Sequence, residues 1–385
     1  MKRFLFVVPP FAGHVHPTVS VARKLTARGH AVAWAAHARG MRHLLPDDAE
    51  MMPLDDDGSD RAAGELVERA KRLRGLESLQ FLWEQMLLPL ARGTFPRLLD
   101  IMTTYAPDVV IADHQALAGA FAARRLGVRF ATFCTTSASI VDPLADLPKV
   151  KEWIDLEIAR LERDAGLEPL PSPDTSPHLV VVFSTETLVG EDHLWPEHFR
   201  FVGPSIQDRP DSTPFPWSEL KDRPRIFVSL GTISASNGTS FYEALASGLG
   251  DLDVQVILAA PPSLVPDPPR NFVVRERVPQ LALLPHVDAV LCHGGHNTVC
   301  EALAHGLPLV VAPIRDDQPV VAGQVVRAGA GIRIRYGRVS LESLRAAVLR
   351  VLREPEFRRG AARIRASFAS AGGALAAADA LEAMA

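Results

Sequence analysis

One short segment in the second half of the chain combines residue types that bind anions. It is Cys292-His-Gly-Gly-His-Asn-Thr298, directly after an apolar run that predicts a buried strand. Adjacent glycines let the backbone approach a ligand closely, and a helix starting near Asn297 presents unpaired N–H groups and its positive dipole end. His293 adds a donor, and Asn297 and Thr298 add polar side chains. The segment predicts a diphosphate site, although a helix cap without ligand uses the same residue types.

Two further loops carry groups that hydrogen-bond to phosphates or sugars. Ser229-Leu-Gly-Thr232 follows an expected strand and offers Gly231 between two hydroxyl side chains. Pro313-Ile-Arg-Asp-Asp-Gln318 follows another expected strand and brings carboxylates and an amide, which pair with sugar hydroxyls. Ligands of open parallel sheets bind at the carboxyl ends of the strands, which is where both loops are expected.

A histidine and an aspartate in the first half are candidates for acid–base chemistry. His14 lies in a loop after the first expected strand, and Asp113 ends another strand of the same expected sheet. A neutral imidazole is a competent general base, and a buried carboxylate on its far nitrogen would fix its tautomer. The residues alone favour a simpler interpretation, a loop histidine and a helix-capping aspartate. His16 and His114 rank below His14 as the base.

Two groups of metal-ligating residues have an unfavourable arrangement. The first is a set of cysteines and histidines near the glycine pair: Cys292, His293, His296 and Cys300. Its first two members are adjacent on a strand and so point to opposite faces, and no paired Cys-x-x-Cys occurs. The second is the run Asp55–Asp57, whose proline and glycine neighbours favour a solvated loop. We therefore expect no metal site.

The elements that must position these residues alternate between strand and helix. In the first half, the expected strands cover residues 4–8, 31–35, 108–112 and 128–133. In the second half, the expected strands cover residues 225–230, 254–259, 272–275, 289–292, 308–312 and 331–334. Helical patterns separate them, including one at 18–28 after the first strand. This alternation predicts an α/β fold with two open parallel sheets, and sheets that face each other would place a site between them.

A proline-rich stretch separates the two halves. Residues 204–224 contain five prolines, which exclude a continuous helix or a central strand. We expect an N-terminal domain at 1–203, a stiff linker at 204–224 and a C-terminal domain at 225–365. Residues 366–385 are expected to form a helix that packs back on the N-terminal domain.

Composition excludes several classes of protein. The 385 residues include 41 Lys+Arg and 45 Asp+Glu, a net charge of −4, which argues against nucleic acid as a partner. Three cysteines exclude a disulfide scaffold. No apolar stretch approaches the roughly 18 residues of a membrane span and no secretory signal is visible, so we expect a soluble, cytoplasmic protein. Without a Gly-x-Gly-x-x-Gly motif, a nicotinamide oxidoreductase is disfavoured.

Four segments together resemble the family 1, UDP-dependent glycosyltransferases of the GT-B fold, especially bacterial members that act on natural products. They are Ala12-Gly-His-Val-His-Pro17, Val228-Ser-Leu-Gly-Thr232, Val278-Pro-Gln280 and the stretch from His293 to Gln318. They lie in both halves, so the resemblance covers nearly the whole chain, and the last segment is the most specific. The resemblance implies two Rossmann-like, parallel-sheet domains that face a central cleft.

The resemblance implies a donor site for a nucleotide-diphosphate sugar in the second half. The implied donor-binding residues are Ser229, Gly231, Thr232, Arg277, Val278, His293, Gly295, His296, Asn297, Thr298, Glu301, Asp317 and Gln318. His293 and the helix start would hold the diphosphate. Glu301 would bind the ribose, and Asp317 with Gln318 the sugar hydroxyls. Arg277 stands where many members have a tryptophan that stacks on uracil, and a guanidinium can also stack on a base.

The resemblance also implies that His14 and Asp113 are the catalytic pair. His14 would take a proton from an acceptor hydroxyl, whose oxygen would attack the anomeric carbon with inversion. The helix dipole and His293 would stabilise the departing diphosphate, so no cofactor or metal is expected. Large apolar residues of the first half would line the site of a hydrophobic small-molecule acceptor, unless they only pack in the core: Phe11, Trp83, Met86 and Leu87.

The expected function is transfer of a hexose, with UDP-glucose as the expected donor, to a hydroxyl of a hydrophobic small molecule. Asp317 and Gln318 favour a fully hydroxylated hexose. Three alternatives stay open: a TDP-deoxysugar transferase acting on a polyketide, a nucleotide-sugar epimerase of the same fold, and a non-catalytic binder of nucleotide sugars.

Overall fold

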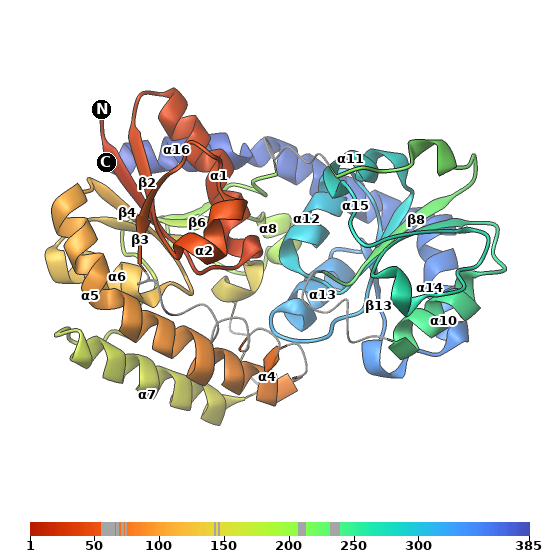
Figure 1. Ribbon diagram of the computed structural model, residues 1–385, viewed down its shortest axis with the longest axis horizontal. Coiled ribbons are helices and arrows are strands. Elements are labelled where there is room, and N and C mark those ends of the chain that lie inside the picture. Colours follow the sequence, from red (N-terminus) through yellow and green to blue (C-terminus); the bar gives the residue numbers. More distant parts are fainter. Residues whose placement is uncertain are drawn as a thin grey trace. The chain divides into compact units, whose positions relative to one another are not determined.

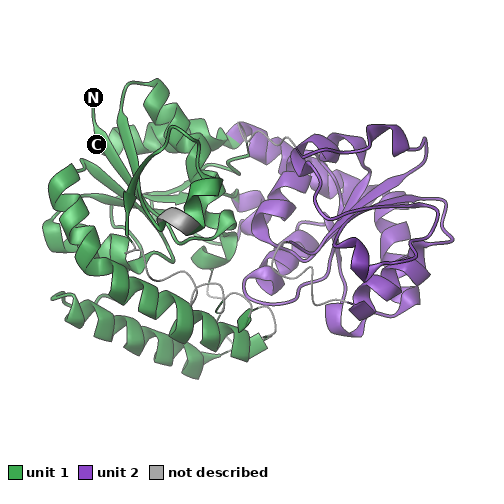
Figure 2. Ribbon diagram, viewed as in Figure 1, with its two compact units in different colours: residues 1–185, 193–209, 371–385 green, residues 186–192, 210–370 purple. Residues whose placement is uncertain are grey.

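The chain forms two compact units, shown in Figure 2. The first contains Met1–Thr185, His193–Arg209 and Ala371–Ala385, and the second contains Glu186–Asp192 and Pro210–Ser370. The second unit thus includes a short stretch from within the expected N-terminal domain, and the first unit includes the end of the chain. This computed structural model describes residues 1–54, 66, 69–70, 73, 75–141, 144, 147–206, 213–231 and 239–385, without the side chains of residues 38 and 39.

The first unit is built on a parallel sheet. Its strands are β1 (Arg3–Val7), β2 (Ala31–Ala36), β3 (Glu50–Pro53), β4 (Val109–Asp113), β5 (Phe130–Cys134), β6 (Val180–Val182) and β7 (Phe199–Phe201). The sheet has seven strands in the order β3-β2-β1-β4-β5-β6-β7. Figure 1 labels β2, β3, β4 and β6 of this sheet. The order reverses between β1 and β4, and open α/β sheets bind ligands at such a switch point.

Helices cover both faces of this sheet, which explains why its strands are apolar without alternation. They are α1 (Ala12–Ala27), α2 (Ala38–Met41), α4 (Gly75–Phe81), α5 (Leu88–Tyr105), α6 (Leu117–Leu126), α7 (Pro148–Asp164) and α16 (Gly373–Met384). Shorter helical turns are η1 (Arg42–Leu44), the π-helical η2 (Leu82–Leu87) and η3 (Ser137–Ile140). Helices α1 and α16 pack over Phe4 and Phe6, whereas α5, α6 and α7 pack over Leu5 and Val7.

The second unit repeats the architecture with a six-stranded parallel sheet. Its strands are β8 (Arg225–Ser229), β9 (Gln255–Ala259), β10 (Phe272–Arg275), β11 (Ala289–Cys292), β12 (Leu309–Val311) and β13 (Gly331–Arg333). Their order is β10-β9-β8-β11-β12-β13, so the switch point lies between β8 and β11. The two sheets confirm the prediction of an α/β fold with two Rossmann-like, parallel-sheet domains.

The helices of the second unit lie on both faces of its sheet. They are α8 (Glu186–Val189), α10 (Thr239–Leu249), α11 (Gln280–Leu283), α12 (His296–Ala304), α13 (Gln318–Arg327), α14 (Leu341–Arg353) and α15 (Pro355–Ala371). The 3-10 turns are η4 (Trp217–Glu219), η6 (Pro262–Leu264), η7 (Leu284–His286) and η8 (Tyr336–Arg338). Helices α10 and α14 pack over Val228, and α12, α13 and α15 pack over Phe227.

Helix α1 begins earlier than the sequence predicts. The expected helix covers residues 18–28. In the structure Pro17 lies inside α1, which begins at Ala12. His14 is therefore in the first turn of a helix and not in a loop, because packing of α1 on the sheet outweighs the hydrogen bond that Pro17 cannot make.

The end of the chain forms two helices separated at Gly372, whose φ of 88° favours glycine. After this break, α16 packs against α1, with Ala377, Ala378 and Leu381 buried in the core of the first unit. Part of the expected linker is also packed, since Phe215 contacts the core of the second unit. Among the described residues, no helix is both long enough and apolar enough to cross a membrane.

Candidate active site

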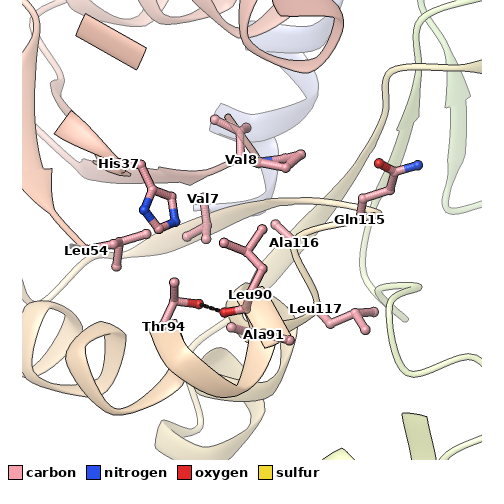
Figure 3. A pocket seen from close by; sticks show the side chains of 12 residues that line it. Val7, Val8, His37, Leu54, Leu90, Ala91, Thr94, Gln115, Ala116 and Leu117 are labelled. Atoms are coloured by element: carbon pink, nitrogen blue, oxygen red, sulfur yellow. Dashed lines mark hydrogen bonds between the residues drawn. The ribbon is translucent and has the colours of Figure 1, made fainter. Parts of the chain in front are cut away.

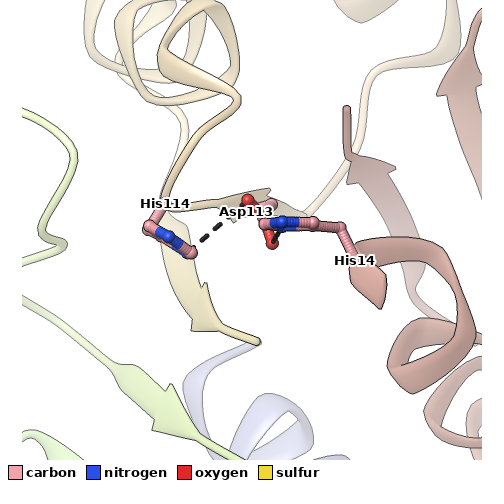
Figure 4. Close-up of side chains that lie close together, drawn as sticks. All are labelled: His14, Asp113 and His114. Atoms are coloured by element: carbon pink, nitrogen blue, oxygen red, sulfur yellow. Dashed lines mark hydrogen bonds and ion pairs between the residues drawn. The ribbon is translucent and has the colours of Figure 1, made fainter. Parts of the chain in front are cut away.

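The switch point of the first sheet brings His14 and Asp113 together (Figure 4). Asp113 is the last residue of β4, and His14 belongs to the helix that follows the neighbouring strand β1. His14 Nδ1 lies 2.9 Å from Asp113 Oδ2, which is a hydrogen bond from the imidazole N–H to the carboxylate. The histidine side chain is 16% exposed and the aspartate side chain 0%. The imidazole therefore reaches the surface, while the carboxylate is fully buried behind it.

The environment of Asp113 keeps it ionised. Burial by itself raises the pKa of Asp113, but the nearby imidazoles of His14 and His114 and a hydrogen bond from the Gln115 backbone lower it to about 2. A carboxylate only accepts hydrogen bonds, so it holds a proton on Nδ1 of His14. The lone pair of His14 is then on Nε2, where it can accept a proton from a ligand.

Thr135 completes this cluster and was not predicted from the sequence. Its Oγ1 lies 2.8 Å from Asp113 Oδ2 and 2.9 Å from His14 Nδ1. The hydroxyl donates to the carboxylate and accepts from the imidazole N–H, so it helps to fix the orientation of both groups. Thr135 directly follows β5, which pairs with β4. Only the strand order places it beside Asp113, since 22 positions separate the two residues.

Asp113 should contribute to stability in a pH-dependent way. Its pKa falls from 3.8 to about 2 on folding, so the contribution is present above about pH 4 and is lost as the pH falls through 2. The unfolding free energy of the wild type minus that of Asp113→Asn should therefore drop by about 1.5 kcal/mol between about pH 6 and pH 2.5. Urea unfolding at both pH values measures this difference, and a constant difference would contradict the assignment.

One group of side chains could hold a metal ion. Ligand atoms of His14, Asp113 and His114 lie within 4.8 Å of one another, the one such group among the described residues. Two imidazoles and a carboxylate suit a divalent transition metal. The thiols near the glycine pair suit one poorly, because burial raises the pKa of Cys292 to about 12 and also raises that of Cys300. The acidic run Asp55–Asp57 lies outside the described residues.

The switch point of the second sheet has the geometry of an anion site. Ser229 ends β8, and His293 directly follows the neighbouring strand β11. Gly294, with a φ of 91°, then turns the chain into the nine-residue helix α12, for which Gly295 is the N-cap. The first turn of α12 contains no acidic residue, and no side chain caps it. The positive dipole end of this helix start therefore favours an anion.

Two glycines leave the space that the imidazole of His293 occupies. A Cβ on Gly295 would lie 2.4 Å from His293 Nε2, and a Cβ on Gly231 would lie 2.7 Å from its Cε1. Gly231 also has a φ of 75°, which favours glycine. Burial lowers the pKa of His293 although the charge of Asp317 raises it, so the imidazole is neutral at neutral pH. A neutral imidazole can donate one N–H to a phosphate oxygen.

The side chains of α12 face different surroundings. His296 is 5% exposed, and its Nε2 lies 3.4 Å from Cys300 Sγ, so its ring packs inward and only its backbone contributes to the helix start. Asn297 and Thr298 are partly exposed in the first turn, as a ligand contact requires. Glu301, one turn further, is 4% exposed and accepts a hydrogen bond from Gln280 Nε2. Gln280 belongs to the Val-Pro-Gln motif, and its contact with Glu301 was not predicted from the sequence.

Gln318 has a different contact from the expected one. It is 7% exposed, and its Oε1 accepts hydrogen bonds from the backbone N–H groups of Ile314 (2.9 Å) and Arg315 (3.1 Å). Its amide oxygen thus holds the loop that ends at α13, and its NH₂ group is the part that can donate to a ligand. Asp317 is partly exposed at the N-cap of α13, and its charge acts on His293.

The structure gives fewer contacts for the other three residues expected to bind the donor, Arg277, Val278 and Thr232. Arg277 is exposed, as stacking on a base would require. Val278 is partly buried against the core of the second unit. Thr232 lies outside the described residues.

The four apolar residues expected to bind an acceptor differ in position. The ring of Phe11 lies edge-on to His14, with 5.8 Å between ring centroids. Trp83, Met86 and Leu87 lie on the π-helical turn η2, and such turns are frequent at functional sites. Trp83 packs against the core under α5 and α6, and Leu87 is only 1% exposed. Phe11 is therefore the one of the four with a described contact to the His14 ring.

A small hollow lies elsewhere in the first unit. Figure 3 shows that residues from β1, α5 and the start of α6 surround it, including Val7, Leu90, Thr94, Gln115 and Leu117. None of the four apolar residues expected at the acceptor site lines it.

Known proteins resemble the chain over its whole length. It is 30% identical to 4'-demethylrebeccamycin synthase of Lentzea aerocolonigenes, over 99% of both chains. Residues 243–384 match the family model "Erythromycin biosynthesis protein CIII-like, C-terminal domain". The crystal structure of the glycotransferase of kitacinnamycin superposes with a TM-score of 0.78 at 25% identity, covering 100% of this chain and 99% of that one.

A further solved structure supports the same fold. Spinosyn rhamnosyltransferase SpnG, complexed with thymidine diphosphate, superposes with a TM-score of 0.75 over 99% of this chain and 100% of that one, at 21% identity. The fold, the full-length relative and the matching positions of the motifs agree. The chain therefore belongs to the nucleotide-sugar-dependent family 1 glycosyltransferases, enzymes of the GT-B fold.

Proposed function

We propose that this enzyme transfers a hexose from a nucleoside-diphosphate sugar to a hydroxyl of a hydrophobic natural product, with His14 as the general base. The observation that carries the proposal is the buried, ionised Asp113 on Nδ1 of His14, at 2.9 Å. This contact fixes the tautomer in which Nε2 accepts a proton. It also stabilises the imidazolium that forms once the proton has moved.

The proposed reaction is a single displacement. His14 Nε2 takes the proton of the acceptor hydroxyl while the oxygen bonds to the anomeric carbon. The bond between that carbon and the diphosphate oxygen breaks with its electron pair, so the configuration inverts. The nucleoside diphosphate leaves with an added negative charge. The N-terminus of α12 and the His293 N–H would stabilise this charge. Electrostatic interactions of this kind can stabilise a transition state by several kcal/mol.

The donor site is proposed to lie along the second sheet's switch point. The diphosphate would bind beside His293 at the start of α12, where the helix dipole favours an anion. Glu301, oriented by Gln280, would accept hydrogen bonds from the ribose. Asp317 would bind a hydroxyl of the sugar. The chemistry of these groups requires no metal or cofactor.

Two nucleotide sugars are candidates for the donor. UDP-glucose is the first candidate, because carboxylate and amide groups at 317 and 318 suit a fully hydroxylated hexose. A TDP-sugar is the second, and the thymidine diphosphate complex of the spinosyn rhamnosyltransferase favours it. For the acceptor, a hydrophobic natural product is supported by the relatives' names and by Phe11 beside His14.

A donor panel followed by a transfer assay tests this proposal. UDP-glucose, TDP-glucose and GDP-mannose are compared by thermal shift, since a ligand that binds only the folded enzyme raises its melting temperature. We expect stabilisation by a uridine or thymidine donor, then release of its nucleoside diphosphate in the presence of a phenolic acceptor. Conversion of the donor to an epimer without any acceptor would instead support an epimerase.

Thr135→Val should weaken catalysis by disturbing the catalytic pair. Without the hydroxyl, Asp113 attracts the imidazolium of His14 more strongly, so the base form appears only at higher pH. We expect kcat to fall about tenfold at neutral pH and the acid limb of the pH–rate profile to move to higher pH. Thr135→Ser keeps the hydroxyl and serves as the control. An unchanged profile in Thr135→Val would contradict this role.

A further inference from the structure

Asp113 lies between two imidazoles, of which the reaction described above uses only one. Its Oδ2 accepts a hydrogen bond from His14, while its Oδ1 lies 3.6 Å from Nδ1 of His114 (Figure 4). The two imidazole rings are 5.6 Å apart between centroids and inclined by 34°. His114 therefore stands beside the general base, on the same carboxylate and at the same end of the sheet.

The geometry determines which nitrogen of His114 can meet a ligand. Nδ1 is buried and has no hydrogen-bond partner within the described part of the chain. The side chain is 10% exposed, so Nε2 is the nitrogen that the exposed edge can offer. The carboxylate of Asp113 favours the proton on Nδ1, which leaves a lone pair on Nε2. His114 thus presents an acceptor of hydrogen bonds beside the base.

Charge supports the same assignment. Burial and the neighbouring His14 lower the pKa of His114, whereas the carboxylates of Asp113 and Asp174 raise it less strongly. The ring is therefore neutral at neutral pH. Two adjacent imidazolium ions would repel each other, and a neutral His114 avoids this when His14 takes its proton.

We propose that His114 Nε2 binds a second hydroxyl of the acceptor, adjacent to the hydroxyl that His14 deprotonates. The substrate class would be acceptors with hydroxyls on neighbouring carbons, such as catechols and vicinal diols. The second hydroxyl must donate a proton to Nε2, so a methyl ether at that position does not replace it. This inference rests on the proposed function and specifies its acceptor.

Three matched acceptors test the proposal: 4-nitrophenol, 4-nitrocatechol and 4-nitroguaiacol. Each is assayed with whichever of UDP-glucose and TDP-glucose supports transfer. The measured quantity is the ratio of kcat/KM for the catechol to kcat/KM for the phenol. We expect a ratio of about ten in the wild type, the effect of one hydrogen bond, with the methyl ether close to the phenol.

Substitutions assign the ratio to His114. His114→Leu keeps the volume but removes the acceptor, so the ratio should fall to about one. His114→Gln places a polar group where Nε2 was and should retain most of the preference. His114→Asn places a polar group where Nδ1 was, so this variant should lose the preference for the catechol. His16→Gln, on the same helix as the base, controls for a nearby histidine change and should leave the ratio unchanged.

The outcomes separate this inference from the proposed function. Transfer by the wild type to all three acceptors without a preference overturns the inference alone. So does an equal loss on phenol and catechol in His114→Leu, because His114 would then act only through Asp113. Transfer to none of the acceptors overturns the proposed function as well.

Discussion

His14→Ala is expected to lower kcat for glycosyl transfer by about 10³-fold while leaving the dissociation constant of the nucleotide sugar within about twofold. The substitution removes the proposed base, the imidazole whose Nδ1 lies 2.9 Å from Asp113 Oδ2. The proposed donor residues belong to the second unit, so donor binding should persist. Steady-state kinetics and calorimetric titration with the nucleoside diphosphate measure the two effects.

Two variants show whether the loss belongs to the catalytic pair. Asp113→Asn cannot accept the Nδ1–H of His14 in the same way and should also lose about 10²- to 10⁴-fold in kcat, since the tautomer is no longer fixed. His16→Ala, two residues along α1, should keep wild-type turnover. Wild-type turnover in His14→Ala would show that another group removes the proton.

Gly295→Ala is expected to raise the dissociation constant for the nucleoside diphosphate on the order of 10²-fold. The added Cβ would lie 2.4 Å from His293 Nε2, so either the imidazole or the start of α12 must move. Each hydrogen bond to a charged phosphate contributes about 1.5–3 kcal/mol, and displacement of the ring and of one backbone N–H removes two of them. Calorimetric titration measures the constant, and kcat at saturating donor should change less.

A glycine without neighbours provides the matched control. A Cβ on Gly337, in the same unit, would have nothing within 4 Å, so Gly337→Ala should bind the nucleotide as the wild type does. Gly231→Ala should resemble Gly295→Ala, since its Cβ would lie 2.7 Å from the same ring. Normal nucleotide affinity in Gly295→Ala would place the diphosphate away from His293.

Much of the fold could be predicted because strand signals are local. Apolar runs such as Phe4–Val8 coincide closely with strands, since residues on a sheet covered on both faces need no polar partner. Helix boundaries were harder to predict. The helix expected at residues 18–28 begins at Ala12 in the structure, because burial of its apolar side against the sheet outweighs the hydrogen bond that Pro17 cannot make.

The sequence by itself determined which residues could do chemistry at the ends of strands. His14, Asp113, His293 and the glycines beside it have types and spacings that only a few kinds of site use. The resemblance to known glycosyltransferases converted those candidates into roles. The candidate residues and the resemblance both depend on which residues are adjacent along the chain, and this information is in the sequence itself.

The tertiary structure alone decided which groups share a hydrogen bond. Thr135 and Gln280 had no assigned role until the order of the strands and the packing of the helices placed them beside Asp113 and Glu301. Strand order is set by hydrogen bonding between segments far apart in sequence, and no local pattern encodes it. The physical reason is that a hydrogen bond forms only when two atoms lie about 3 Å apart, and that distance depends on how the whole sheet is assembled. The type of each residue is known without it.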